Sequence, residues 1–341
     1  MIVLGLALYF WVARSSGTDS GTKQAVTSSK GAPDQAAAST GTVTHIYAHN
    51  LRLHQGPDFR VYILWLRGDL VRTKKNEIPS FDDQDSFYLN ITTGVMRANL
   101  GDIGNYLNEK LHGGALTDVV IRGTGQQVKI TGKFHKVVPL PIQLIGTVSP
   151  ASGNRIQIHV AKIDVLKIPF KWLLKSVHVS LADMVGTGKI PGVDINGNDI
   201  FLYPEQLLPP PHIQGTLTGV SLGTPDLELV YGNAAKDVQK VEQWRNFLRL
   251  RDGTLDFGKL TMHNVDLMMI DISQDAWFDL DLANYQAQLV NGYTRMTPEA
   301  GLQIFMPDVS SLKPSTAKDI SIQWFKNRKV APPADVVPRK H

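Results

Sequence analysis

The chain has 341 residues, contains no cysteine and carries a formal net charge of +4 at pH 7. The lack of cysteine excludes disulfides, thiol nucleophiles and thiolate metal sites. A chain of this length can bury a substantial core. Its charge falls short of the concentrated basic surface of a nucleic-acid-binding protein, so we expect no nucleic-acid partner.

The N-terminal segment differs in composition from the rest of the chain. Residues 1–13 are almost wholly apolar, and residues 14–41 consist mainly of small and polar residues with isolated charges. A membrane-spanning helix needs roughly 20 apolar residues, and a secretory signal begins with a basic segment that is missing here. We interpret residues 1–13 as an apolar anchor or a truncated signal or transmembrane segment, and residues 14–41 as a flexible linker.

From residue 42 onward, strand patterns dominate the sequence. Apolar and polar side chains alternate along residues 126–134 and 155–165, as they do in strands with one buried and one solvated face. Residues 61–66 are apolar on both faces, which predicts a central strand covered on both sides. Residues 193–202 predict a hairpin closed on Asn196-Gly197.

A first amphipathic helix is predicted for residues 99–111. Asn99 is a favourable N-terminal cap. Ile103, Leu107 and Leu111 recur at helical spacing and form one apolar face. We expect these three side chains to contact a bound acyl chain if the protein holds one.

A second amphipathic helix is predicted for residues 169–184. Its apolar face consists of Phe170, Leu173, Leu174, Val177 and Leu181. Beside this face runs a row of lysines, namely Lys167, Lys171 and Lys175. The helix either packs on the sheet as part of the core or lines an apolar groove. In the second case the lysines meet anionic headgroups at the membrane surface, each contributing about 1 kcal/mol.

The C-terminal third adds a helix and a further run of strands. Residues 234–250 predict the helix, and a coarse boundary falls just before it. We therefore divide the chain into a core of residues 42–231 and an extension of residues 232–325 that packs on it. Residues 326–341 are basic and rich in proline, which is typical of a disordered tail.

No motif points firmly to catalysis. Ser221 lies in a G-x-S-x-G pattern, but a nucleophile elbow requires a helix directly after the serine, and a strand is predicted there. Asp279 and Asp281 share a strand face and could act as a carboxylate pair, although acidic residues on a strand edge more often keep it soluble. We expect no catalytic residue, no metal site and no cofactor.

The order of elements over residues 94–231 resembles bacterial envelope proteins of the LmeA-like lipid-binding family, which have a tubular lipid-binding type of fold. The similarity lies in residues 99–111 leading into 119–121, residues 128–132 with 139–142, and residues 156–165 running into 167–174. Residues 253–258 and the strands after them resemble AsmA-type envelope proteins. The resemblance implies a curved sheet around helices, an apolar tube for acyl chains and no enzymatic activity.

Together these observations predict an α+β, β-dominated fold, with a long curved antiparallel sheet wrapped around two or three amphipathic helices. The expected function is a non-catalytic, membrane-tethered lipid-binding or lipid-transfer protein of a bacterial cell envelope. Its expected partners are a phospholipid or other acyl lipid and the membrane itself, and its domain is expected to be periplasmic or extracytoplasmic. The alternatives are a structural envelope protein with a self-filled core and a serine or carboxylate hydrolase.

Overall fold

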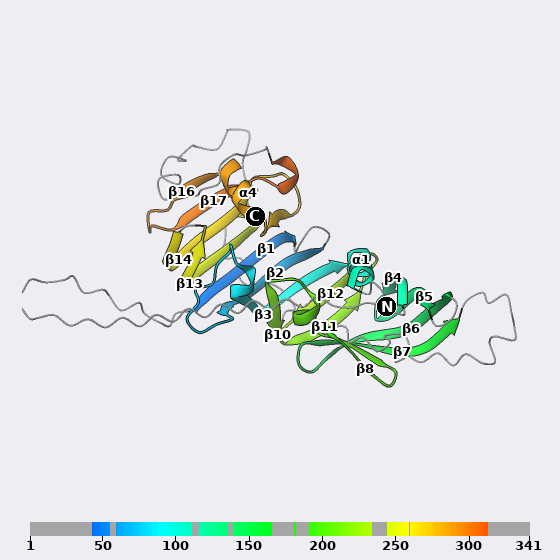
Figure 1. Cartoon of the computed structure of the whole chain (residues 1–341). Helices are drawn as coiled ribbons and strands as arrows, with labels where there is room; N and C mark the ends of the chain where they lie inside the picture. The colour runs from blue at the N-terminus through cyan, green and yellow to red at the C-terminus, as the bar shows by residue number, and fades with distance from the viewer. Residues whose placement is uncertain are drawn as a thin grey trace, which may run out of the picture. The chain divides into compact units, whose positions relative to one another are not determined.

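The computed structural model describes residues 43–54, 59–110, 116–135, 139–165, 181, 191–233, 244–258 and 260–312. Within this part of the chain, strands dominate and form two sheets that do not close on themselves (Figure 1). The prediction of a β-dominated fold is therefore confirmed. None of the helices in the described residues has the length and apolar character required to cross a membrane.

The larger sheet has 11 strands within the described residues. Nine of them follow the order β11-β12-β3-β2-β1-β13-β14-β17-β16, while β10 pairs with β3 and β15 pairs with β1. The strands are β1 (Thr44–His54), β2 (Arg60–Arg72), β3 (Phe87–Asn99), β10 (His212–Gly215), β11 (Leu217–Leu222), β12 (Asp226–Tyr231), β13 (Phe247–Phe257), β14 (Leu260–Asp271), β15 (Phe278–Asp281), β16 (Tyr293–Met296) and β17 (Leu302–Met306).

The smaller sheet has 6 strands in the order β4-β5-β6-β7-β9-β8 within the described residues. They are β4 (Leu116–Thr124), β5 (Gln127–His135), β6 (Pro139–Ala151), β7 (Arg155–Val165), β8 (Val193–Asn196) and β9 (Asp199–Leu202). The helical elements are α1 (Leu100–Lys110), α3 (Pro204–Leu207), α4 (Tyr285–Asn291) and the 3-10 turns η1 (Gln84–Ser86) and η3 (Val309–Ser311).

One continuous apolar core joins the two sheets. Alternate residues of β2 and β3 and alternate residues of β6 and β7 belong to the same buried cluster, so each sheet turns one face into it. The backbones also meet where Gly125 and Leu222 exchange two hydrogen bonds of 2.6 and 2.5 Å. A second, smaller cluster that includes Phe247 and Ile270 covers the opposite face of the larger sheet at its C-terminal strands.

The prediction of a single antiparallel sheet is wrong. The strands divide between two sheets, and the larger one contains parallel pairs between β1 and β15, β3 and β10, and β14 and β17. The extension after residue 232 continues this sheet, because β13 pairs with β1. The wrapping of a sheet around helices stays a prediction, since most of the second helix lies outside the described residues.

Two sequence-based assignments in the C-terminal part are also wrong. Residues 247–250 belong to β13 and not to a third helix; residues 234–243 lie outside the described residues. Phe247 belongs to the smaller apolar cluster, whereas Leu248 and Leu250 belong to the main core on the opposite face of the sheet. Because this strand is buried on both faces, its apolar residues do not alternate with polar ones, and such a run can be mistaken for a helix. Leu289, which falls within the run of strands expected in the C-terminal third, lies in α4 and is fully buried.

Candidate functional site

An apolar cavity of about 80 Å³ lies between α1, α3 and the two sheets. The larger sheet forms one wall, α1 a second, and the β9–α3 segment with β7 a third. The residues that line it are Phe59, Val61, Met96, Arg97, Ala98, Ile103, Tyr106, Leu107, Ile156, Leu202, Pro204, Leu207, Leu208, Leu227 and Leu229. Nearly all of these side chains are apolar, so the cavity favours an apolar occupant.

The sheet wall consists of two rows of side chains that run across β2, β3 and β12. Ala98 lies directly opposite Val61 on one side and Leu227 on the other. In the next row, Met96 lies opposite Ile63 and Leu229. Directly opposed residues point to the same face of a sheet. The alternation of β3 from Gly94 to Asn99 therefore places both rows on the face that meets α1.

The helical wall begins where β3 ends. The Asn99 side-chain oxygen accepts hydrogen bonds from the backbone N–H groups of Gly101 at 2.8 Å and Asp102 at 3.3 Å, as predicted for a helix cap. One turn later, Ile103 and Leu107 reach the cavity from one face of α1.

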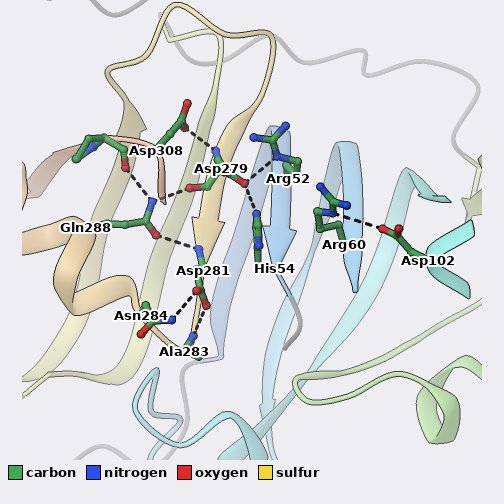
Figure 2. Close-up of polar contacts among 11 residues, drawn as sticks. Arg52, His54, Arg60, Asp102, Asp279, Asp281, Ala283, Asn284, Gln288 and Asp308 are labelled. Atoms are coloured by element: carbon green, nitrogen blue, oxygen red, sulfur yellow. Dashed lines mark hydrogen bonds and ion pairs between the residues drawn. The ribbon is translucent and has the colours of Figure 1, made fainter. Parts of the chain in front are cut away.

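Two polar contacts fix α1 at its sides. The Asn108 amide donates to the carbonyl oxygen of Val119 at 2.9 Å and accepts from its N–H at 2.7 Å, so it caps the backbone of β4. On the other side, Arg60 Nε of β2 lies 3.4 Å from Asp102 Oδ2 (Figure 2). This ion pair joins the β2 and α1 walls of the cavity.

A second, smaller cavity of about 20 Å³ follows along the same strands. Ile63 and Leu66 of β2 belong to its lining, as do Phe87 and Leu89 of β3. Ile63 lies opposite Met96, which lines the larger cavity, so the two cavities adjoin along the sheet.

The structure places some of the predicted lipid-contacting residues. Ile103 and Leu107 line the larger cavity. Leu181 is a helical residue buried in the core, 4% exposed, and does not line either cavity described above. The other predicted positions lie outside the described residues, namely Leu111, Phe170, Leu173, Leu174, Val177, Lys167, Lys171 and Lys175.

The sequence-based prediction missed the strand residues of the cavity wall. Met96, Ala98, Leu227 and Leu229 carry the alternation of a strand, and that alternation shows which side chains share a face. The alternation does not show that β12 pairs with β3. This pairing brings the two residues of β3 and the two residues of β12 together in one wall of the cavity.

A polar cluster around Asp279 is the second candidate site (Figure 2). Arg52 Nε donates to Asp279 Oδ1 at 2.8 Å, and His54 Nε2 contacts the same oxygen. Both come from β1, which runs parallel to β15 with Arg52 opposite Asp279. Burial by itself would raise the pKa of Asp279, but the hydrogen bonds and charges of His54 and Arg52 lower it to about 2.

The cluster continues into the loop after β17. Asp308 accepts a hydrogen bond from the N–H of Asp279 at 3.2 Å, and its buried carboxyl has a raised pKa. Gln288 of α4 donates to the carbonyl oxygens of Asp279 at 2.6 Å and Pro307 at 2.9 Å, and accepts from the N–H of Asp281 at 2.9 Å. These contacts hold β15, α4 and η3 together.

The hypothesis that Asp279 keeps a strand edge soluble is wrong, because Asp279 is only 3% exposed. The hypothesis that Asp279 and Asp281 act together as a carboxylate pair is not supported either. The Asp279 carboxylate is occupied by Arg52 and His54, whereas that of Asp281 accepts from Ala283 N–H and the Asn284 amide. The surroundings of Asp279 are those of a structural ion pair.

The remaining candidate groups have ordinary surroundings. Ser221 lies within β11 opposite Glu228, and β12 follows after a turn, as the strand interpretation predicts. Two histidines of β1 that could be considered as metal ligands, His45 and His49, have separate partners: Asp69 at 2.7 Å and the carbonyl oxygen of Arg245 at 2.9 Å. In the part of the chain that the structure describes, no three His, Asp or Glu side chains gather as a metal site.

Asp271, at the end of β14, is a third buried carboxyl. It accepts hydrogen bonds from the Asn246 amide at 3.0 Å and from Ser273 N–H at 2.6 Å. Burial nevertheless raises its pKa to about 7, and the nearby Asp308 acts in the same direction. The folded protein therefore holds the Asp271 proton more tightly than the unfolded chain does.

We expect Asp271 and Asp279 to give the stability a pH dependence of opposite sign. The raised pKa of Asp271 stabilises the fold fully below its ordinary value of 3.8, and this contribution is lost as the pH rises toward about 7. The lowered pKa of Asp279 stabilises the fold above 3.8 and is lost as the pH falls toward about 2.

Urea unfolding between pH 2 and pH 9 tests this expectation. Relative to Asp271→Asn, the free energy of unfolding of the wild type should fall by a few kcal/mol between about pH 4 and pH 7. Above pH 7 the difference between the two proteins should stay constant. Asp275→Asn, at an exposed position nearby, is the control. A constant difference between the wild type and Asp271→Asn across this range would contradict the assignment.

Comparisons of this chain with protein-family models, with curated proteins and with solved structures found no match. The geometry of the cavity and of the polar cluster is therefore the basis for the functional proposal.

Proposed function

We propose that this protein is a non-catalytic lipid-binding or lipid-transfer protein of a bacterial cell envelope. Residues 1–13 would tether it to the membrane, with the folded part on the periplasmic or extracytoplasmic side. The observation that supports this proposal is the cavity between α1 and the sheets, with its nearly uninterrupted apolar lining. The row formed by Lys167, Lys171 and Lys175 stays a prediction for headgroup contacts.

An acyl chain suits this cavity better than a peptide does. Every peptide residue brings an N–H and a carbonyl group that need hydrogen-bond partners when buried. The lining offers almost no such partners. An acyl chain needs none, and its transfer from water to an apolar site contributes about 0.8 kcal/mol per methylene.

The size of the cavities favours a second candidate function. The larger has about 80 Å³ and the smaller about 20 Å³. Aromatic side chains such as Phe81, Phe87 and Phe257 belong to the buried core, and the first two line the smaller cavity. A structural envelope protein whose core is filled by its own side chains would have this appearance, and it would bind no lipid.

Native mass spectrometry of the full chain, purified from membranes in a mild detergent, separates the two candidates. A lipid carrier should retain acyl lipid at near-integral stoichiometry and take up a fluorescent fatty-acid probe that unlabelled lipid displaces. A structural protein should show the mass of the bare chain and no saturable uptake, which would overturn the proposal.

A further inference from the structure

The larger cavity ends within a few residues along the sheet. Three neighbouring rows of residues cross β2, β3 and β12 on the face that meets the core, and only the first two contribute to the cavity. All three side chains of the first row line it, namely Val61, Ala98 and Leu227. In the second row, Met96 and Leu229 line it, whereas Ile63 lines the smaller cavity. The cavity therefore loses its β2 wall in the second row.

The third row closes the space behind the second. It consists of Leu66, Gly94 and Tyr231, and none of the three lines the larger cavity. A Cβ atom added to Gly94 would lie only 2.9 Å from Cα and Cβ of Leu66, so this row has no free space next to β3. A chain that reaches the second row cannot continue along the sheet.

Residue size along β3 explains where the cavity lies. Ala98 in the first row is small, and the space that a larger side chain would fill there belongs to the cavity. Met96 precedes it by two residues and points to the same face of the strand. Its long side chain is 2% exposed and fills the second row. Met96 thus forms the inner end of the cavity.

The outer side of the cavity is the one that solvent reaches. Its lining from α1 and the β9–α3 segment includes the half-buried side chains of Ile103, Leu107 and Leu207. The side chains of the sheet wall are buried. Because α1 begins directly after β3, the first row lies nearer to this helix than the second does. A straight chain that enters beside α1 therefore passes Ala98 and meets Met96 with its methyl end.

We propose that Met96 limits the length of the acyl chain that this protein binds, and that Ala98 provides the space for that chain. The inference rests on the proposed function. An acyl chain gains affinity with every methylene that leaves water. Carbons for which the cavity has no room stay in water and add nothing. A closed end at Met96 therefore favours acyl chains up to one length, beyond which longer chains bind no more tightly.

The test compares straight saturated fatty acids, from octanoate to stearate, in displacing a fluorescent fatty-acid probe from the full chain. For the wild type, the affinity should rise about fourfold with each added methylene and then level off. Met96→Ala removes Cγ, Sδ and Cε from the inner end, and the space they leave collapses only in part. The affinity should then level off about two methylenes later, so the gain over the series should be about fifteenfold larger.

Ala98→Val tests the same inference in the opposite direction, without creating a cavity. Its added methyl groups occupy the first row, where the chain passes. The affinity should level off about one methylene earlier than in the wild type, so the gain over the series should be about fourfold smaller.

Met269→Ala is the matched control. Met269 of β14 is a fully buried methionine of the same core, and it lines neither of the two cavities. The substitution removes the same atoms as Met96→Ala and should lower the stability to a similar extent. Its affinities should nevertheless level off at the same chain length as those of the wild type.

The outcomes separate this inference from the proposal on which it rests. If the wild-type affinity keeps rising up to stearate, or if Met96→Ala levels off where the wild type does, the role of Met96 is refuted while lipid binding stands. An equal shift in Met269→Ala refutes it as well. If Met96→Ala does not fold, an unchanged profile of Ala98→Val refutes the inference. If neither the probe nor any fatty acid binds, the proposed function itself is refuted.

Discussion

Replacing Asp279 with asparagine is expected to lower the free energy of unfolding by about 3 kcal/mol. The substitution removes the negative charge on which Arg52 and His54 converge and leaves the Arg52 guanidinium, 25% exposed, without its anion. Removing one partner of a buried ion pair commonly costs 3–5 kcal/mol. The partial exposure of Arg52 places our expectation at the lower end of that range. Urea unfolding at pH 7 measures the change.

Asp281→Asn is the matched control for this experiment. Asp281 lies on the same strand, but its carboxylate accepts hydrogen bonds from Ala283 N–H and the Asn284 amide at exposed positions. Losing such contacts costs about 1 kcal/mol. Equal destabilisation by the two variants would show that the Arg52–Asp279–His54 cluster does not anchor β15 to β1.

Sequence patterns predict the strands and α1 because those features are local. The alternation along β5 and β7, the double-sided run in β2 and the Asn99 cap each depend on neighbours in the chain. The hairpin is correctly placed as well, although its two turn residues are Gly197 and Asn198, since Asn196 pairs with Asp199.

The site depends on pairings between distant segments, which no local pattern encodes. Arg52 meets Asp279 only because β15 runs parallel to β1, although the two residues lie 227 positions apart. The alternation in β15 correctly indicates that Asp279 and Asp281 share a face. It cannot indicate that α4 and the loop at Asp308 cover that face and turn an expected soluble edge into a buried cluster.

The same limit applies to the sheet wall of the larger cavity. In the sequence, Leu227 and Leu229 are residues of one more alternating strand. They line the cavity because β12 pairs with β3, which places them beside Ala98 and Met96. The sequence does supply Ile103 and Leu107, because helical spacing alone places them on the face of α1 that meets the cavity.

Leu107→Asp is expected to abolish uptake of an acyl probe if the proposed function is correct. Leu107 lies in the α1 wall of the larger cavity, where no basic side chain of the described lining except Arg97 is present, and Arg97 is already paired with Glu228 at 2.8 Å. An acyl chain in the cavity would remove water from the new carboxylate, which costs several kcal/mol for an unpaired charge. We therefore expect the affinity for a fluorescent fatty-acid probe to fall at least about a hundredfold.

Two further variants isolate the effect of the cavity wall. Asn105→Asp places the same charge on the exposed side of α1, two residues earlier, and should leave uptake unchanged. Leu107→Met keeps the volume and apolar character of the wall and should reduce uptake only slightly. If Leu107→Asp folds and still binds the probe as the wild type does, the acyl chain does not occupy this cavity. If Asn105→Asp also loses uptake, the integrity of α1, and not the apolar wall, is what binding requires.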